Sequence, residues 1–381
     1  MPTRSHQLVT LFAAVAISGM ASCYKRHEVP RTAKITTETR SVQRAIDKPA
    51  TDAQPEHLAD IPAPSPQPIP TEAGLKVAVF GDQGVRATSH AVLQLIAREH
   101  ADMVIHLGDL SYDEASPSAW EAQVDSVLGP DFPYFAVIGN HDIPSWFIEG
   151  GFAQLLGARL SRMTGAHCQG EYAINASCTF RGLHFVLSGV GTYGHEHEPF
   201  LRNALETSQA QHNLCIWHKN QRDMQVGGKI DEVGWQAYQI CAERGAPIIT
   251  GHEHSYSRTY ALSALGDRKQ GHGAGGSASE LLLGRGRTFV VVSGLGGESI
   301  RPWTPEHKGD SWWASIYAGN LQVLNGETQG VRPRIDFGVL FITYGVEGDP
   351  LRASAYFKTT ADEVADLFSW RSEPLVISAA K

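Results

Sequence analysis

Three short apolar runs, each followed by a glycine and then an acidic or amide residue, constrain the fold of this chain most. The runs are 76–80, 103–107 and 134–138, and the polar residues behind them are Asp82, Asp109 and Asn140. Helix-period patterns at 90–98 and about 119–128 separate the runs, which predicts strands alternating with helices. Ligands bind at the carboxyl ends of strands in open α/β sheets, so we expect these three oxygen donors to meet at one edge.

Later apolar runs continue the pattern and predict a layered α/β fold. Further strands are predicted at 183–187, 214–217, 247–250, 288–292, 337–343 and 352–357, and further helices at 200–211 and 232–244. The glycine-rich segment 271–279 is predicted to be a flexible surface loop.

Four more side chains of the metal-binding type follow apolar runs: Tyr112, His218, His252 and His254. Oxygen donors come first and imidazoles last, which suits two neighbouring hard or borderline metal ions. Two cations about 3.5–4 Å apart repel each other, so a bridging carboxylate is expected, and Asp109 is the candidate bridge. A phenolate donor such as Tyr112 favours a trivalent ion such as Fe(III).

The order of these motifs resembles that of the calcineurin-like metallophosphoesterases. The motifs are Asp82-Gln-Gly84, Gly108-Asp-Leu-Ser-Tyr112, Gly139-Asn-His-Asp142, His218 and Gly251-His-Glu-His254. Gly84 stands where most of the superfamily carries a histidine ligand, and with Tyr112 it resembles the purple acid phosphatase branch. The resemblance spans about residues 75–358. It implies a metallophosphoesterase-type four-layer α/β/β/α sandwich, in which helices flank two mixed β-sheets.

The resemblance also implies two metal ions with one shared ligand. The Fe(III) site would use Asp82, Asp109, Tyr112 and His254, and a divalent Zn, Mn or Fe site would use Asp109, Asn140, His218 and His252. The chain departs from the family at 219–225, where the substrate-contacting histidines of relatives have no match. Plant members carry a β-sandwich domain before the catalytic one, whereas a tether precedes it here.

The expected reaction is hydrolysis of a small-molecule phosphate monoester, in which metal-bound hydroxide attacks phosphorus. His141 is the candidate general acid, and Asp142 would orient or tune it. Arg258 and Arg301 could contact phosphate, although ordinary salt-bridged arginines are more common. Two alternatives remain: a phosphodiesterase with the same metals, and a non-catalytic surface lipoprotein that binds a partner.

The N-terminal residues are typical of export. Residues 1–23 combine Arg4, an apolar stretch from Leu8 to about Ala21 and Met20-Ala-Ser-Cys23, which resembles a bacterial lipoprotein signal with lipid attached to Cys23. Residues 24–73 are proline-rich and predict an extended tether before a catalytic domain at 74–381. We therefore expect a periplasmic or cell-surface protein whose only membrane contact is the anchor, and the net charge of −8 gives no basic footprint for nucleic acid.

Four cysteines remain after Cys23, which permits two disulfides in an exported protein. Cys168 and Cys178 flank a short loop and are the more plausible bridge. Cys215 and Cys241 lie in strand-like and helix-like runs, so buried free thiols are as plausible there as a second bridge.

Overall fold

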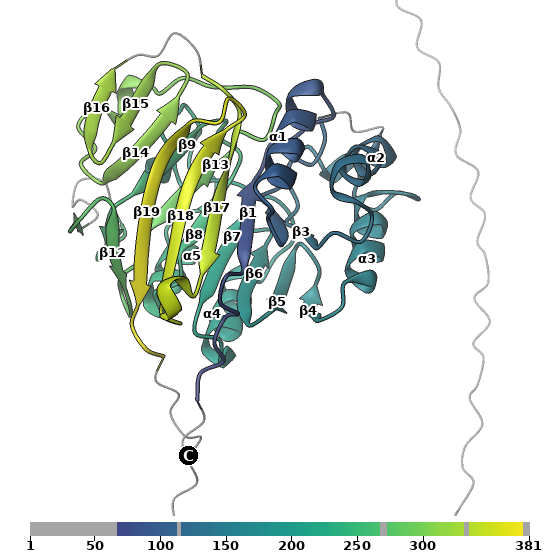
Figure 1. Cartoon of the computed structure of the whole chain (residues 1–381), viewed down its shortest axis with the longest axis horizontal. Coiled ribbons are helices and arrows are strands. Elements are labelled where there is room, and N and C mark those ends of the chain that lie inside the picture. The colour runs from purple at the N-terminus through teal and green to yellow at the C-terminus, as the bar shows by residue number, and fades with distance from the viewer. Residues whose placement is uncertain (1–66, 113–115, 267–272, 331–334, 376–381) are drawn as a thin grey trace, which may run out of the picture. The chain divides into compact units, whose positions relative to one another are not determined.

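The computed structural model describes residues 67–112, 116–266, 273–330 and 335–375 (Figure 1). The predicted signal at 1–23 and the tether up to residue 66 lie outside these residues. Residues 67–73 were also predicted to be tether, but they contact the folded unit. Ile69 forms a β-bridge with Ala210, and the carboxylate of Glu72 forms an ion pair with Arg181 at 2.5 Å. The packed part of the chain therefore begins before residue 74.

One sheet has seven strands in the order β12-β19-β18-β17-β1-β2-β3. Its strands are β1 (Lys76–Phe80), β2 (Met103–His106), β3 (Tyr134–Ala136), β12 (Glu280–Leu283), β17 (Gly338–Tyr344), β18 (Arg352–Thr359) and β19 (Val364–Ser372). Strands β1, β2 and β3 run parallel, while β17 joins β1 in antiparallel register. The carboxyl ends of the first three predicted strands therefore lie at one edge, as expected.

The second sheet has ten strands in the order β16-β15-β14-β9-β13-β8-β7-β6-β5-β4. Its strands are β4 (Ala166–Glu171), β5 (Asn175–Phe180), β6 (Leu183–Ser188), β7 (Asn213–Trp217), β8 (Ile248–Thr250), β9 (Tyr256–Thr259), β13 (Val290–Ser293), β14 (Trp313–Ala318), β15 (Leu321–Leu324) and β16 (Glu327–Gly330). Its centre, from β6 through β7 and β8 to β13, is parallel. A small separate sheet pairs β10 (Ala261–Leu262) with β11 (Ala274–Gly275).

Three apolar cores hold four layers together. The largest core lies between the two sheets and contains Val79 and Ile105 from one sheet and Phe185 and Ile216 from the other. Helices α1 (Ala87–Arg98), α2 (Pro117–Leu128) and α3 (Phe152–Arg162) cover the seven-stranded sheet, and α4 (His197–Thr207) and α5 (Gln236–Arg244) cover the ten-stranded sheet. Short 3₁₀ helices are η1 (Ile143–Ser145), η2 (Arg222–Met224), η4 (Pro305–His307) and η5 (Val346–Gly348). The predicted α/β/β/α sandwich is confirmed.

Two predicted helices have different ends in the structure. The helix expected at 232–244 begins only at Gln236, because the Asp231 carboxylate accepts hydrogen bonds from the N–H groups of Val233 and Gly234, and Gly234 has φ +73°. The helix expected at 200–211 ends at Thr207, and Ala210 pairs with Ile69 instead. The predicted loop at 271–279 contains β11, so part of it is paired backbone.

Both cysteine pairs are close enough to be bonded. Cys168 and Cys178 form the predicted bridge between β4 and β5. Cys215 on β7 and Cys241 on α5 form a second disulfide that links the sheet to its covering helix, which resolves the alternative left open by the sequence. Among the described residues, every helix is too short or too polar to span a lipid bilayer.

Candidate dinuclear metal centre

Loops at the carboxyl ends of β1, β2, β3, β7 and β8 bring all seven predicted ligands to one place. Asp82, Asp109 and His252 each have a left-handed backbone, with φ of 62°, 55° and 67°. Residues other than glycine adopt this conformation at a cost, and such strain gathers at functional sites where the surrounding structure enforces it. The sharp turns let each strand end in a side chain that points along the sheet edge.

One group of donors consists of Asp82, Tyr112 and His254. The Tyr112 hydroxyl donates to Asp82 Oδ1 at 3.1 Å and lies 2.9 Å from His254 Nε2. Asp82 Oδ1 is 3.2 Å from the same imidazole nitrogen. The other oxygen of Asp82 accepts the backbone N–H of His252 at 2.9 Å, which ties this group to the next one.

The second group consists of Asp109, Asn140, His218 and His252. His218 Nε2 is the central atom: it lies 3.3 Å from Asp109 Oδ1, 3.2 Å from Asn140 Oδ1 and 3.2 Å from His252 Nδ1. Within the described part of the chain, Asp109, His218 and His252 form a cluster whose ligand atoms all lie within 4.8 Å of one another. The two predicted groups are thus adjacent, as a shared ligand requires.

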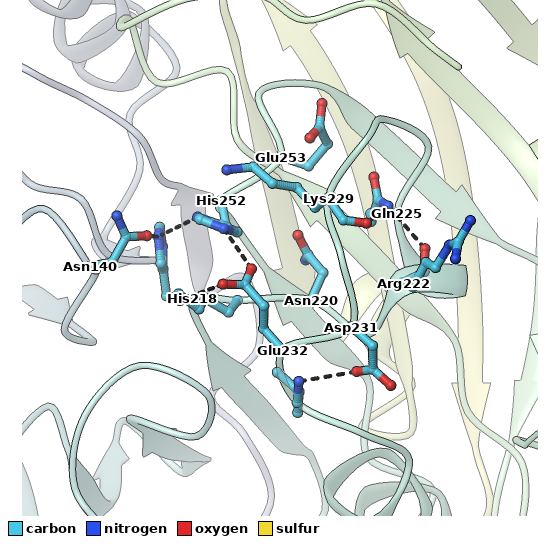
Figure 2. A network of polar contacts seen from close by, with 12 residues as sticks. Asn140, His218, Asn220, Arg222, Gln225, Lys229, Asp231, Glu232, His252 and Glu253 are labelled. Carbon is cyan, nitrogen blue, oxygen red and sulfur yellow. Dashed lines mark hydrogen bonds and ion pairs between the residues drawn. The ribbon is translucent and has the colours of Figure 1, made fainter. Parts of the chain in front are cut away.

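The outer nitrogen of each histidine is already occupied, which leaves the inner nitrogen for a metal. His218 Nδ1 contacts Leu107 O at 2.8 Å, and His254 Nδ1 contacts Ser299 Oγ at 2.5 Å. His252 Nε2 contacts the carboxylate of Glu232 at 2.8 Å (Figure 2). Metal-binding histidines are typically oriented by such contacts. The three imidazoles, the carboxylates and the phenol therefore fit two bound cations.

The electrostatics of the site also favour cations. Burial opposes protonation of His218, but Asp109 outweighs it and raises the pKa of this imidazole to about 9, so a proton holds the position between donors that a cation would take. Burial raises the pKa of the Tyr112 hydroxyl, and the charges of Asp82 and Asp109 raise it further. A multivalent cation reverses that balance, because it stabilises the phenolate.

The backbone at the centre permits no larger residue at Gly139. A Cβ on Gly139 would lie 2.0 Å from the backbone nitrogen of Asp109 and 2.2 Å from its Oδ1. The loops after β2 and β3 therefore touch through their backbones, which is why glycine precedes Asn140.

The two predicted catalytic residues lie beside this centre in different roles. The ring of His141 packs on that of Tyr112, with 4.5 Å between ring centroids, and the backbone N–H of His141 donates to Asp109 Oδ1 at 2.9 Å. Asp142 is buried, and its carboxylate accepts the N–H groups of Gly139, Leu110 and Asp109 at 2.7, 2.8 and 3.0 Å. These contacts make Asp142 a positioning residue for the loops that carry Asp109 and Asn140, rather than a side chain that acts on the ring of His141.

Three supporting residues were not predicted from the sequence. Glu232 and Ser299 contact metal-ligand histidines, and Lys219 pairs with Glu232 at 2.5 Å. Burial raises the pKa of Glu232, but hydrogen bonds from His252 and Lys219 outweigh it and bring the pKa to about 2. The sequence contains only a weak indication of these roles. Ser299 follows the glycine-rich stretch after β13, and Glu232 lies in a segment that was predicted to be helical.

The two arginines that were predicted as possible phosphate contacts lie in different places. Arg258 is buried on β9 and forms a two-pronged ion pair with Asp366 on β19, so it is a structural residue. Arg301 lies beside the metal centre, where its Nη1 donates to His252 O at 3.2 Å.

Residues 75–256 match the profile of the family described as calcineurin-like phosphoesterase. Over these residues the chain is similar to that family. Members of the calcineurin-like phosphoesterases depend on two metal ions, and the candidate centre lies at the expected motifs. No curated protein sequence matches the chain.

Several solved structures are similar to this chain at low sequence identity. Purple acid phosphatase PPD1 from yellow lupin (Lupinus luteus) seeds superposes with a TM-score of 0.57 at 18% identity, over 81% of this chain and 55% of that one. This chain therefore spans about half the length of the lupin phosphatase. PhoD gives a TM-score of 0.45 at 12% identity (77% of this chain, 67% of that one), and a dimetal phosphatase from Danio rerio gives 0.41 at 12% (78% and 99%). The likeness to the lupin phosphatase concerns the fold alone.

Proposed function

We propose that this metallophosphoesterase hydrolyses phosphate monoesters with a purple-acid-phosphatase-type centre. Fe(III) would be held by Asp82, Asp109, Tyr112 and His254, and a divalent Zn, Mn or Fe ion by Asp109, Asn140, His218 and His252. The observation that carries the proposal is the Tyr112 hydroxyl between Asp82 Oδ1 and His254 Nε2. A phenol in that position is a ligand for a trivalent ion.

The metals, when bound, supply Lewis acidity and an activated water at mild pH. The residues of the chain arrange the rest. Asp142 fixes the loops that carry Asp109 and Asn140, and Glu232 and Ser299 fix the two imidazoles of the Gly251–His254 motif. The ring of His141, half-buried beside Tyr112, would give a proton to the leaving oxygen of the ester.

The first test compares initial rates on an aryl phosphomonoester and the matching diester, with and without chelator. We expect chelator-sensitive turnover that favours the monoester. Preference for the diester would support the phosphodiesterase alternative, and no turnover on either ester in metal-loaded protein would support the binding-protein alternative.

The second test concerns Tyr112 itself. The loaded protein should have a visible tyrosinate-to-Fe(III) charge-transfer band, and Tyr112→Phe should abolish it. Persistence of the band in that variant would show that another residue supplies the phenolate, and the assignment to the purple branch would fail.

We also propose that the protein is exported and anchored through Cys23. Its support is the apolar stretch that ends at Met20-Ala-Ser-Cys23, together with two disulfides that suit an oxidising compartment. Cell fractionation and detergent partitioning of the wild type and Cys23→Ala test this. The wild type should partition with membranes, and the variant should not; equal partitioning would contradict the anchor.

A further inference from the structure

The segment between β7 and α5 is packed against the metal centre and carries Lys229, a cation with no ion-pair partner in the described part of the chain. Gln225 Nε2 donates to the carbonyls of Arg222 and Lys229 at 3.0 and 3.1 Å, and Gln225 Oε1 accepts Gly227 N at 2.6 Å. His307 Nε2 and Thr304 Oγ1 both contact Gly227 O, at 3.0 and 3.1 Å. Buried and partly buried hydrogen bonds therefore hold this segment in place. They fix the position of the backbone from which the Lys229 side chain extends.

This segment touches the Gly251–His254 motif directly. A Cβ on Gly227 would lie 2.2 Å from Oε1 of Glu253, so the backbone of this segment lies directly against the Glu253 carboxylate. Figure 2 shows the side chain of Lys229 running from this segment toward His252 and Glu253. The electrostatic neighbours of its ammonium group include Arg301, Glu253, Asp82 and Glu232. Lys229 thus lies at the side of the centre formed by His252.

Lys229 has no ion-pair partner among the residues that the structure describes. Burial lowers its pKa, and the charge of Arg301 lowers it further. Glu253 is buried, lies 3.7 Å from Arg301, and neither of its oxygens has a hydrogen-bond partner among the described residues. Lys229 and Arg301 thus bring two cations to one side of the metal ligands, beside the buried carboxylate of Glu253.

We propose that Lys229, supported by Arg301, binds the phosphate group of the substrate at the divalent-metal side of the centre. A half-buried ammonium is a strong point-charge donor to phosphate oxygens. The segment that carries Lys229 follows His218, where substrate-contacting histidines would be expected and are not found. The ligand class is a tetrahedral oxyanion, either as an ester or as free inorganic phosphate. This inference rests on the proposed function but is tested without turnover.

The test is titration of inorganic phosphate into metal-loaded wild type, Lys229→Met and Lys229→Arg, followed by calorimetry. Loss of a charge-assisted contact should weaken phosphate binding about 10- to 100-fold in Lys229→Met, and Lys229→Arg should recover part of it. Arg98→Met, which removes an exposed cation on α1 that lies 3.8 Å from Asp362, is the matched control and should bind as the wild type does.

Metal content separates a structural role from a phosphate contact. Lys229→Met should keep both metals while it loses phosphate affinity and raises KM with a smaller change in kcat. Unchanged phosphate affinity, or weaker affinity that is explained entirely by lost metal, would overturn the inference. Failure of the proposed function would look different, because a wild type without phosphatase activity would still bind phosphate through Lys229.

Discussion

Two buried polar regions of this molecule are built on opposite plans. In the metal centre, atoms with lone electron pairs point at one another. These atoms are the carboxylate oxygens of Asp82 and Asp109 and the inner nitrogens of the histidines. Between the sheets, Arg258 donates to both oxygens of Asp366 at 2.7 and 3.0 Å, and Tyr256 donates to the same carboxylate at 2.7 Å. In the second region the polar groups satisfy one another's hydrogen bonds and charges. In the first region they are complementary to bound cations.

The contrast teaches how to separate a binding site from a structural network when both are buried. Buried charges are normally paired and hydrogen-bonded, as Arg258 and Asp366 are. A cluster of acceptors that is stabilised by outer contacts, such as Ser299 on His254, keeps its inner atoms for a ligand. Such sites reduce the stability of the protein in exchange for function.

The largest effect should come from Asp109→Asn, which removes the bridging carboxylate. We expect kcat/KM to fall on the order of a thousandfold or more, with loss of bound metal, because both cations share this ligand. In chelator, the free energy of unfolding should fall modestly, because the Asp109 carboxylate pairs with protonated His218 and accepts the backbone N–H of His141 when no metal is bound. Denaturant unfolding in chelator checks this, and a large loss of stability would erase the contrast between the two regions.

The next largest effect concerns the buried ion pair between Arg258 and Asp366. Asp366→Ala should lower the free energy of unfolding by about 3–5 kcal/mol, because it leaves Arg258 buried and unpaired. The double variant Arg258→Met with Asp366→Leu should recover most of that loss. Activity per folded molecule should be unchanged in both, and a selective fall in kcat/KM would show that this pair also serves the site.

Glu232→Gln should have an intermediate effect on metal binding. Weakening the contact to His252 Nε2 should reduce divalent-metal affinity about 10- to 100-fold, with little effect on Fe(III). Competition with a chelator of known affinity measures both metals. Glu243→Gln, an exposed glutamate on α5 paired with Arg202, is the matched control and should leave both affinities unchanged. Equal loss of both metals would mean that the Fe(III) site and the divalent-metal site do not bind their ions independently.

The smallest effect should be a pH dependence far from the site. Burial raises the pKa of Glu99, but hydrogen bonds from Lys358, Tyr356 and Lys76 outweigh it and bring the pKa to about 2, against 4.5 when unfolded. Its contribution to stability is therefore full above about pH 4.5 and is lost as the pH falls toward 2. Glu99→Gln should cost about 2 kcal/mol at pH 7 and almost nothing near pH 2.

Urea unfolding at a series of pH values measures the effect of Glu99→Gln. Glu280→Gln, at an exposed position on β12, should show no such trend. A constant difference between Glu99→Gln and the wild type across the pH range would contradict the assignment of this stability to the ionised carboxylate.

The parts of the fold that the sequence predicted are those with a local signal. β1 was predicted at its observed bounds, and α2, β7 and β18 differ from their predictions by two residues or fewer at each end. Several strands were not predicted, among them β4, β5, β9, β14, β15, β16 and β19. β16 has no apolar run, and β9 is paired by β13 and β14, which lie far along the chain. The prediction that residues 232–235 are helical was wrong, because Asp231 stabilises a turn there.

The sequence alone predicted the donor set of the candidate metal centre, because each of these residues follows a strand end or a glycine turn and is therefore positioned locally. Only the tertiary structure showed which contacts surround that set: Glu232 on His252, Ser299 on His254, Asp142 on the loop of Asp109, and Lys229 beside them. These contacts join segments that lie far apart in the chain, and no periodicity records them. They depend on how the loops pack across the edge of the two sheets, and that packing is a property of the whole fold.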